Sequence, residues 1–296
     1  MKIKDILKTE RTLSFEFYPP KRTELVGSVF KTIKQMEKYC PNFISITYGA
    51  GGSTQVFTEE IAVRAQKELD VEVMCHLTCA GRSREELHEL LERLSQAGLD
   101  NVIGLRGDNS GENQEMFVPA KDGFAHATEL IEYIKHNFSF GIAAACYPQG
   151  HPQALDLTTD LEYTKRKVEL GADFLITQLF YDNNHFFEFL DRARKIGIDV
   201  PILAGVLPIL NTAQIRRFTA LCGVKIPLAL DRKLEYFADD EEAVRELGVE
   251  YATDQVRSLL DGGVNGIHFY VLNRTYSVPR ILCNLGILGE LNHADS

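Results

Sequence analysis

Eight short apolar runs, rich in β-branched and aromatic residues, recur along this chain, and longer amphipathic stretches separate them. The runs cover residues 13–18, 43–47, 73–78, 101–105, 140–146, 174–177, 202–206 and 266–270. Helical spacing of apolar residues marks the stretches 54–69, 83–96, 123–137, 160–170, 183–196, 211–221 and 249–261. Strands that alternate with helices favour a parallel sheet, and eight of them predict a closed barrel. We therefore expect an α/β fold, a single (βα)8 barrel of the TIM type with one or two extra helices.

Glycines mark the ends of several of these helical stretches. In each case a strand run follows within a few residues, as at Gly98, Gly171, Gly197 and Gly263. Glycine readily adopts the left-handed conformation that terminates helices, so this repeated pattern supports the alternation of helix and strand. The acidic segment 238–247 predicts an extra helix before the last strand, with Asp239 to Glu242 as its solvated first turn.

No linker or low-complexity tract divides the chain, so we expect residues 1–296 to form one catalytic domain. A final helix is expected over residues 276–289. It ends so near the last residue that we expect no appended regulatory domain.

The totals exclude several classes of protein. Of the 296 residues, 45% are apolar and 25% are charged, which is ordinary for a globular protein. The net charge of −10 argues against general binding to nucleic acid or an anionic membrane, although a local basic cluster could hold a phosphate. The chain shows neither a signal peptide nor a transmembrane run. We therefore expect a cytoplasmic protein with reduced thiols, and no disulfide or metal role, at Cys40, Cys75, Cys79, Cys146, Cys222 and Cys283.

The chemistry of a βα barrel lies where its strands end, and the first run carries a carboxylate near that point. Alternation places Phe15 and Phe17 on one face and Ser14 and Glu16 on the other. If the apolar face meets the helices, Glu16 points into the barrel. Burial would raise the pKa of this carboxyl and suit it to donate a proton near neutral pH. The alternative is a structural Glu16 paired with an arginine.

Other polar residues follow the next strands. The loop over residues 47–53 is glycine-rich, which suits close approach to a ligand, but it lacks the G-x-G-x-x-G fingerprint of a Rossmann fold. His76 is either a satisfied core residue or a ligand contact. Arg106 and Asp108 lie together at a loop and could form a purely structural ion pair. The basic run Lys165 to Lys167 is either a solvated helix face or a phosphate contact.

At these residues the sequence resembles the methylenetetrahydrofolate reductase family. The resemblance spans nearly the whole chain through SFEFYPP, SITYGAGG, HLTC, LRGD, YPQGHP, TKRK, ITQLFYD, GVLP and HFYVLNR, in the family's order. It implies a βα barrel that binds FAD without a Rossmann domain. It also implies a ping-pong reaction, in which NADH or NADPH reduces FAD and reduced FAD then converts methylenetetrahydrofolate to methyltetrahydrofolate. The cofactor performs the hydride chemistry, while the protein orients and tunes it.

The resemblance also implies roles for single residues. Glu16 matches the general acid that protonates the folate ring, and Asp108 matches the residue that tunes the flavin and holds the pterin. Contacts to FAD are expected at Tyr48, Ala50, His76, Arg106, Gly107, Asp108, Ala125, Tyr147, His151, Ala154, Asp160, Tyr163, Arg166 and Lys167. Tyr163 stands where the family can carry an amide. Contacts to folate or nicotinamide are expected at Thr47, Asp108, Gln178, Gln214, Phe218, Tyr270 and Arg274, with Phe218 as a stacking aromatic.

Two other functions remain open at this point. One is a related flavin enzyme that runs in the oxidative direction or takes electrons from a protein donor. The other is a flavin- or folate-binding barrel without turnover, although binding alone does not need the proton donor that Glu16 would be. The expected partners are the folate and a nicotinamide nucleotide, with neither nucleic acid nor membrane. The resemblance further implies a homo-oligomer, and we expect no inhibition by S-adenosylmethionine through a regulatory domain.

Overall fold

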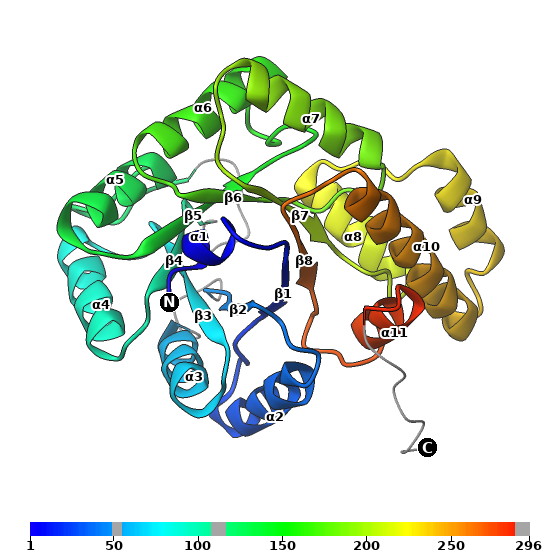
Figure 1. Cartoon of the computed structure of the whole chain (residues 1–296), viewed down its shortest axis with the longest axis horizontal. Coiled ribbons are helices and arrows are strands. Elements are labelled where there is room, and N and C mark those ends of the chain that lie inside the picture. Colours follow the sequence, from blue (N-terminus) through cyan, green and yellow to red (C-terminus); the bar gives the residue numbers. More distant parts are fainter. Residues whose placement is uncertain (49–54, 108–116, 288–296) are drawn as a thin grey trace.

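A computed structural model describes residues 1–48, 55–107 and 117–287 of the chain. Eight parallel strands form a closed barrel in chain order, with β8 paired to β1 (Figure 1). The strands are β1 (Thr12–Phe17), β2 (Phe43–Ile46), β3 (Glu72–Thr78), β4 (Asn101–Leu105), β5 (Gly141–Cys146), β6 (Phe174–Thr177), β7 (Ile202–Val206) and β8 (Gly266–Tyr270). The predicted barrel is confirmed, and each predicted strand boundary lies within one residue of the observed one.

Helices surround the barrel on all sides in Figure 1. They are α1 (Ile3–Ile6), α2 (Val26–Glu37), α3 (Gln55–Glu68), α4 (Arg84–Gln96), α5 (Ala127–Asn137), α6 (Leu157–Glu169), α7 (Asn183–Lys195), α8 (Thr212–Cys222), α9 (Leu228–Tyr236), α10 (Glu241–Asp261) and α11 (Ser277–Asn284). A short 3-10 helix, η1 (Thr23–Leu25), precedes α2. The predicted glycine stops are confirmed, because Gly98, Gly171, Gly197 and Gly263 all have positive φ.

Several predicted helix boundaries are wrong: α5 begins at Ala127 and not at 123, α6 begins at Leu157 and not at 160, and the last two predicted helices differ as well. The acidic segment 238–247 is not a separate helix, because α10 runs without a break through Gly248 to Asp261. A side chain at Gly248 would place a Cβ 2.1 Å from the Ile209 carbonyl oxygen, so this glycine allows close packing and does not end the helix. The last helix ends at Asn284, before the predicted residue 289, and Gly286 follows with φ of +67°. The acidic first turn is exposed as expected, and the Asp240 side chain caps α10 by accepting the Ala243 N–H.

Apolar side chains pack on both faces of the barrel strands, one layer outside the barrel and one inside it. Outside it, Phe15 and Phe17 pack with buried residues of the surrounding helices, including Phe30 and Ile33 of α2. Inside it, a separate cluster fills the half nearer the amino ends of the strands. This inner cluster consists of Ile3, Leu7, Phe43, Met74, Ile103, Ala143, Phe174, Ile176 and Leu203. The same strands therefore bury apolar surface on both faces, which is typical of a parallel barrel.

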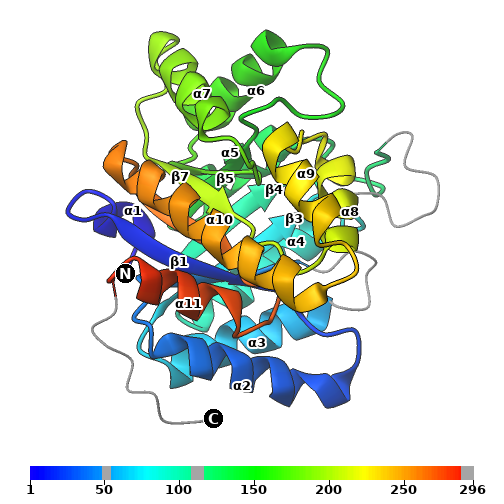
Figure 2. The same cartoon turned by 90° about the vertical axis from the view of Figure 1, so that its right-hand side faces the viewer.

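Helix α1 closes the end of the barrel where the strands begin. The Ile3 N–H donates to Asn101 Oδ1 at 2.8 Å, and the Met1 amino group lies 2.7 Å from the Glu72 carboxylate. Asn101 and Glu72 are the first residues of β4 and β3. Figure 2 shows α1 at one end of the barrel and α8 and α9 toward the other. The opposite end, where the strands finish, is left for a site.

Within the described ranges, no helix is both long and apolar enough to span a membrane. All six cysteines are free thiols.

Candidate active site

A buried carboxylate lies inside the barrel near the carboxyl ends of the strands. Glu16 Oε2 lies 3.4 Å from His76 Nε2 and 3.5 Å from His268 Nε2. Glu16 comes from β1, His76 from β3 and His268 from β8, so three strands converge on one carboxylate. The Glu16 side chain keeps 19% of its exposure, whereas His268 is fully buried. Glu16 thus faces the barrel interior, as the alternation on β1 predicts.

Two serines complete this group, which we call the Glu16 cluster (Ser14, Glu16, Ser45, His76 and His268). Ser14 Oγ lies 3.2 Å from the Ile267 carbonyl oxygen, to which it donates, and 2.8 Å from His268 Nδ1. The contact with Ser14 holds the His268 ring by its Nδ1 atom. The Nε2 atom of His268 then faces Glu16 and Ser45, which lies 3.4 Å away. The Nε2 atoms of His76 and His268 thus both face the Glu16 carboxylate.

The direction of the Glu16 pKa differs from the sequence-based prediction. Burial raises this pKa, but the hydrogen bond with His268 and the charges on His76 and His268 together outweigh burial and hold it below its ordinary value. The predicted rise is therefore wrong, because the histidines come from strands far away in the sequence. The alternative of an arginine partner is wrong as well. Burial lowers the pKa of His76 to about 4, although the charge of Glu16 opposes that change.

A second group gathers where β5 leads into α6. The Lys167 ammonium donates to the Ala145 carbonyl oxygen at 2.8 Å and lies 5.9 Å from the centre of the Tyr147 ring. Burial lowers the pKa of Lys167, although Asp160 opposes that change. Asp160 is itself buried, and burial raises its pKa against the charge of Lys167. The Tyr147 and His151 rings meet edge to face at 4.7 Å.

The predicted cofactor residues around α6 do not all join this group. Arg166 is exposed and lies 3.6 Å from Glu169 on its own helix. The Tyr163 side chain is 60% exposed. Ala154 lies in the turn before α6, where its N–H donates to the His151 carbonyl oxygen at 2.9 Å. Of the basic run, only Lys167 is turned toward the barrel.

The remaining predicted cofactor residues lie at the ends of β2, β3 and β4. Gly107 has φ of +81°, and a Cβ there would lie 2.9 Å from Thr78 Cβ, so only glycine fits without strain. Arg106 Nε donates to the Gly107 carbonyl oxygen at 3.3 Å. The Tyr48 ring lies 5.6 Å from the Arg82 guanidinium. Ala125 lies just before α5, where its N–H donates to Glu129 at 3.0 Å.

Two predicted residues, Ala50 and Asp108, lie outside the described residues. The Thr47 N–H donates to the Phe17 carbonyl oxygen at 2.8 Å, which continues the β1–β2 pairing.

The ends of β6 and β8 are joined across β7. The Tyr270 hydroxyl donates to the Thr177 carbonyl oxygen at 2.6 Å, and the Gly205 N–H donates to Thr177 Oγ1 at 2.9 Å. A Cβ at Gly205 would lie 2.2 Å from the Thr177 carbonyl oxygen and 2.7 Å from the Tyr270 hydroxyl, so β7 needs glycine here. Gln178 follows Thr177 directly, and its side-chain oxygen accepts the Leu179 N–H at 2.8 Å. Gln178 and Tyr270, both predicted to contact substrate, are thus held by neighbouring bonds.

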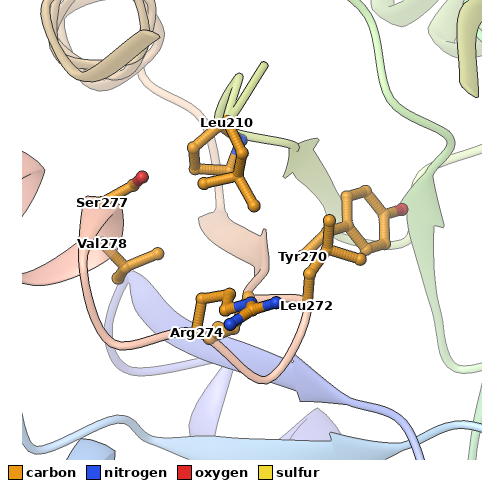
Figure 3. A pocket seen from close by; sticks show the side chains of 8 residues that line it. Leu210, Tyr270, Leu272, Arg274, Ser277 and Val278 are labelled. Carbon is orange, nitrogen blue, oxygen red and sulfur yellow. The ribbon is translucent and has the colours of Figure 1, made fainter. Parts of the chain in front are cut away.

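Of the other predicted substrate residues, Gln214 and Phe218 lie on α8, and Arg274 lies in the loop after β8. Gln214 Oε1 accepts the Leu210 N–H at 2.8 Å, which leaves the buried Nε2 group without a hydrogen-bond partner. Phe218 is half-buried and packs against the apolar cluster under α8, α9 and α10. Arg274 is exposed and lines a small cavity. Figure 3 shows Leu210 and Arg274 on opposite sides of that cavity, with Tyr270 at one flank and Ser277 at the other.

Three residues of the Glu16 cluster were not predicted as site residues: His268, Ser14 and Ser45. A signal for His268 was present, because His268 and Tyr270 alternate with Ile267 and Phe269 along the last strand. That alternation places His268 on the same face as Tyr270. The two serines carried no comparable signal, since small hydroxyl residues are common in buried strands.

The fold and the site define a class: a βα-barrel protein with a carboxylate–histidine pair inside the barrel and polar residues around its rim. The chain belongs to the methylenetetrahydrofolate reductase family, whose sequence profile matches residues 2–286. It is 40% identical over 301 residues to "Methylenetetrahydrofolate reductase (NADH) 1" of Arabidopsis thaliana, a match that covers 98% of the chain and 51% of that relative. The corresponding protein of Zea mays is 41% identical over 94% of the chain and 48% of the relative.

The chain thus spans about half the length of these plant relatives. A bacterial relative, "5,10-methylenetetrahydrofolate reductase" of Salmonella typhimurium, is 34% identical, and the match covers 93% of the chain and 90% of the relative. Among solved structures, a Clostridium thermocellum protein described as binding two copies of 5-methyl-5,6,7,8-tetrahydrofolic acid has a TM-score of 0.65. The match covers 96% of this chain and 98% of that one. At 16% sequence identity, the likeness shows a common fold alone.

Proposed function

We propose that this protein reduces 5,10-methylenetetrahydrofolate to 5-methyltetrahydrofolate, with bound FAD as its cofactor and NADH or NADPH as the reductant. The observation that carries this proposal is the Glu16 carboxylate held between His76 and His268 inside the barrel, at the end where βα-barrel enzymes act. Family membership supports the reaction, and the plant relatives are named for NADH. The Clostridium thermocellum protein, described as binding the expected product, supports the folate part of the proposal.

The residues around β4, β5 and α6 fit a large anionic cofactor. Lys167 supplies a buried positive charge that suits a phosphate, because a cation in a desolvated place gains more from an anionic partner than one in water. Gly107 lets the chain turn sharply at the end of β4, next to Arg106. His76 Nε2 is buried without a hydrogen-bond partner and can meet a ligand polar atom there. FAD, when bound, supplies the hydride relay between the nicotinamide and the folate.

Glu16 delivers the proton that opens the folate ring to a reactive iminium. In the described structure its pKa is low, but 19% of the side chain is still exposed. A folate ring over Glu16 removes that remaining hydration, which favours the protonated carboxyl. The protonated Glu16 carboxyl then gives its proton to the ring nitrogen, while Ser14 fixes the orientation of the His268 imidazole beside Oε2. Gln178 and Tyr270 hold the substrate from the ends of β6 and β8.

An anaerobic visible spectrum tests the proposal. The purified protein, loaded with FAD, is mixed first with NADH or NADPH and then with methylenetetrahydrofolate. We expect the flavin absorbance to bleach with the nucleotide and return with the folate. Flavin that bleaches but does not return excludes the folate as electron acceptor. Failure to bind FAD at all overturns the proposed function.

A further inference from the structure

The loop after β8 carries two consecutive non-glycine residues in the left-handed backbone conformation. Leu272 and Asn273 both have φ of +53°. Asparagine adopts this conformation with little strain, whereas a bulky side chain such as that of Leu272 rarely does. Within the described ranges, the other non-glycine residues with positive φ are Cys40 and Asp122, and each of them stands alone. A strained pair of this kind persists only where surrounding contacts hold it.

The Asn273 side chain supplies two such contacts. Its Nδ2 group donates to the Tyr18 carbonyl oxygen at 2.8 Å, and its Oδ1 atom accepts the Tyr18 N–H at 3.1 Å. Tyr18 directly follows β1, so this amide joins the loop after β1 to the loop after β8. It extends the pairing of the two strands, in which the Val271 N–H donates to the Glu16 carbonyl oxygen at 3.3 Å.

The Leu272 side chain holds the same loop from its other side. It packs against the apolar cluster under α8, α9 and α10 and lines the small cavity of Figure 3. The Arg274 N–H donates to the Val271 carbonyl oxygen at 3.1 Å, which closes a four-residue turn. We call these residues the β8 turn (Val271, Leu272, Asn273 and Arg274). The turn is therefore fixed by an apolar contact on one side and by the Asn273 amide on the other.

Arg274 leaves the β8 turn with a side chain that has no anchor of its own. It was predicted to contact substrate, and it lines the small cavity together with Tyr270 (Figure 3). In the part of the chain that the structure describes, its guanidinium has neither an ion pair nor a hydrogen bond. The direction of this side chain therefore depends on the backbone of the β8 turn.

We propose that Asn273 is a positioning residue, which holds the β8 turn so that Arg274 points at the bound folate. This inference rests on the proposed function, because Arg274 meets substrate only if the barrel binds folate. Without the amide, Leu272 is free to return to negative φ, and the arginine that follows is redirected. Glu16 should stay in place, since β1 is paired with both β2 and β8. Loss of Asn273 should therefore weaken folate binding and leave proton transfer intact.

The test replaces Asn273 by Gly, which removes the amide and keeps a residue that adopts positive φ freely. We expect the affinity of the FAD-loaded protein for 5-methyltetrahydrofolate, measured by calorimetry, to fall about tenfold, as loss of one hydrogen bond to a charged group would give. The folate half-reaction at saturating methylenetetrahydrofolate should keep its rate, and so should flavin reduction by NADH or NADPH. An unchanged folate affinity would overturn the proposal.

A matched control is Asn137→Ala. The Asn137 amide also donates to a tyrosine carbonyl oxygen, that of Tyr133 at 2.8 Å, but it lies at the end of α5, where the strands begin. This variant should bind folate as the wild-type protein does. An equal loss of affinity in both variants would show a general effect on the fold and contradict a role specific to Asn273.

A double-variant cycle shows whether Asn273 acts through Arg274. Arg274→Gln alone should weaken folate binding by about the same factor, and Asn273→Gly should then add little to it, because residues in one chain of contacts are not additive. Losses that multiply would show that Asn273 does not act through the arginine, and the proposal would fail. A purely structural role predicts such independent losses.

The remaining outcomes separate this inference from the proposed function. Slower flavin reduction with unchanged folate affinity in Asn273→Gly would assign the β8 turn to the nucleotide and overturn the inference alone. If the wild-type protein binds no folate, the proposed function and the inference fail together. Thermal unfolding shows whether each variant is folded. If the Gly variant is not, Asn273→Ser repeats the test, because its short hydroxyl can replace at most one of the two bonds to Tyr18.

Discussion

The two ends of the barrel interior are built from the same strands and differ in almost every other respect. Toward the amino ends, Phe43, Met74 and Phe174 fill the interior under α1. Toward the carboxyl ends, Glu16 and the two histidines occupy the equivalent space. The boundary is a stacked contact between the Phe43 and His268 rings, with centres 5.9 Å apart and an angle of 18°. Burying a carboxylate and two imidazoles costs free energy, and the apolar half offsets that cost by removing a large apolar area from water.

The side chains that stabilise the barrel and those proposed to act in the reaction are therefore separated along the barrel axis. Substitutions in the apolar half should therefore change the free energy of unfolding and spare the half-reactions. Substitutions in the polar half should slow a half-reaction and change the free energy of unfolding less. The following variants test that separation, from the largest expected effect to the smallest.

Replacing Glu16 by Gln should abolish folate reduction, with a loss of about 10²–10⁴-fold, because the amide cannot donate the proton. Binding of FAD and its reduction by NADH or NADPH should stay near wild type. Stopped-flow measurement of the two half-reactions, each followed by flavin absorbance, checks this. A near wild-type rate of the folate half-reaction would remove Glu16 from the role of acid.

Replacing Phe174 by Ala should lower the free energy of unfolding by about 3–5 kcal/mol, since a fully buried ring is deleted from the apolar half. Urea denaturation measures the loss. Tyr236→Ala is the matched control, because that ring is 83% exposed and its loss should cost little. The folded fraction of Phe174→Ala should keep both half-reactions. A selective loss of the folate half-reaction would show that the two ends are not separate.

The stability of the protein should fall as the pH drops from 6.5 toward 4. Burial lowers the pKa of His76 from 6.5 in the unfolded chain to about 4 in the folded one, so in this range only the unfolded state takes up the proton. Stability is thus retained above 6.5 and lost below it, by about 2 kcal/mol at pH 5. Denaturation at pH 7 and pH 5 measures the difference.

The variant His76→Gln should show a smaller difference between the two pH values, whereas His136→Gln, on the exposed end of α5, should not. An unchanged difference in His76→Gln would contradict the assignment to this histidine.

Ser14→Ala should have the smallest effect, a loss of about 1 kcal/mol in stability for one hydrogen bond. Its more informative effect is on pH dependence. Without Ser14, the His268 ring is no longer held beside Glu16, whose pKa its hydrogen bond lowers. The pH profile of the folate half-reaction should therefore shift, while that of the nucleotide half-reaction stays. Superimposable profiles in wild type and variant would show that Ser14 is only structural.

The strands could be predicted because their signal is local. Each is a short β-branched or aromatic run, and glycines such as Gly98 and Gly171 mark where the preceding helix stops. The continuous helix α10 could not be predicted, because the packing of Gly248 against Ile209 involves a residue from the loop after β7. Glycine inside a helix has a low propensity, and the tertiary contact that favours it here has no trace in the neighbouring sequence.

In the candidate site, too, features set by a single strand could be predicted, and features set by contacts between distant strands could not. That Glu16 faces the barrel interior follows from alternation on a single strand. Its pKa depends on His76 and His268, which lie on β3 and β8 and meet it only through closure of the barrel. Likewise, Lys165 to Lys167 form one run in the sequence, yet helix geometry turns Lys167 inward and leaves Arg166 exposed. Contacts between distant strands were beyond the reach of spacing alone.

The missing side chain at Gly205 lets β6 and β8 touch across the strand that separates them in the sheet. The hydrogen bond from the Tyr270 hydroxyl to the Thr177 carbonyl oxygen links β8 directly to β6. A displacement at Gln178 therefore reaches Tyr270 without passing around the sheet. Through the β8–β1 pairing, in which Tyr270 stands opposite Glu16, it then reaches the carboxylate. If these residues have the roles proposed above, a change at the proposed substrate contact Gln178 is expected to alter the position of the Glu16 carboxyl.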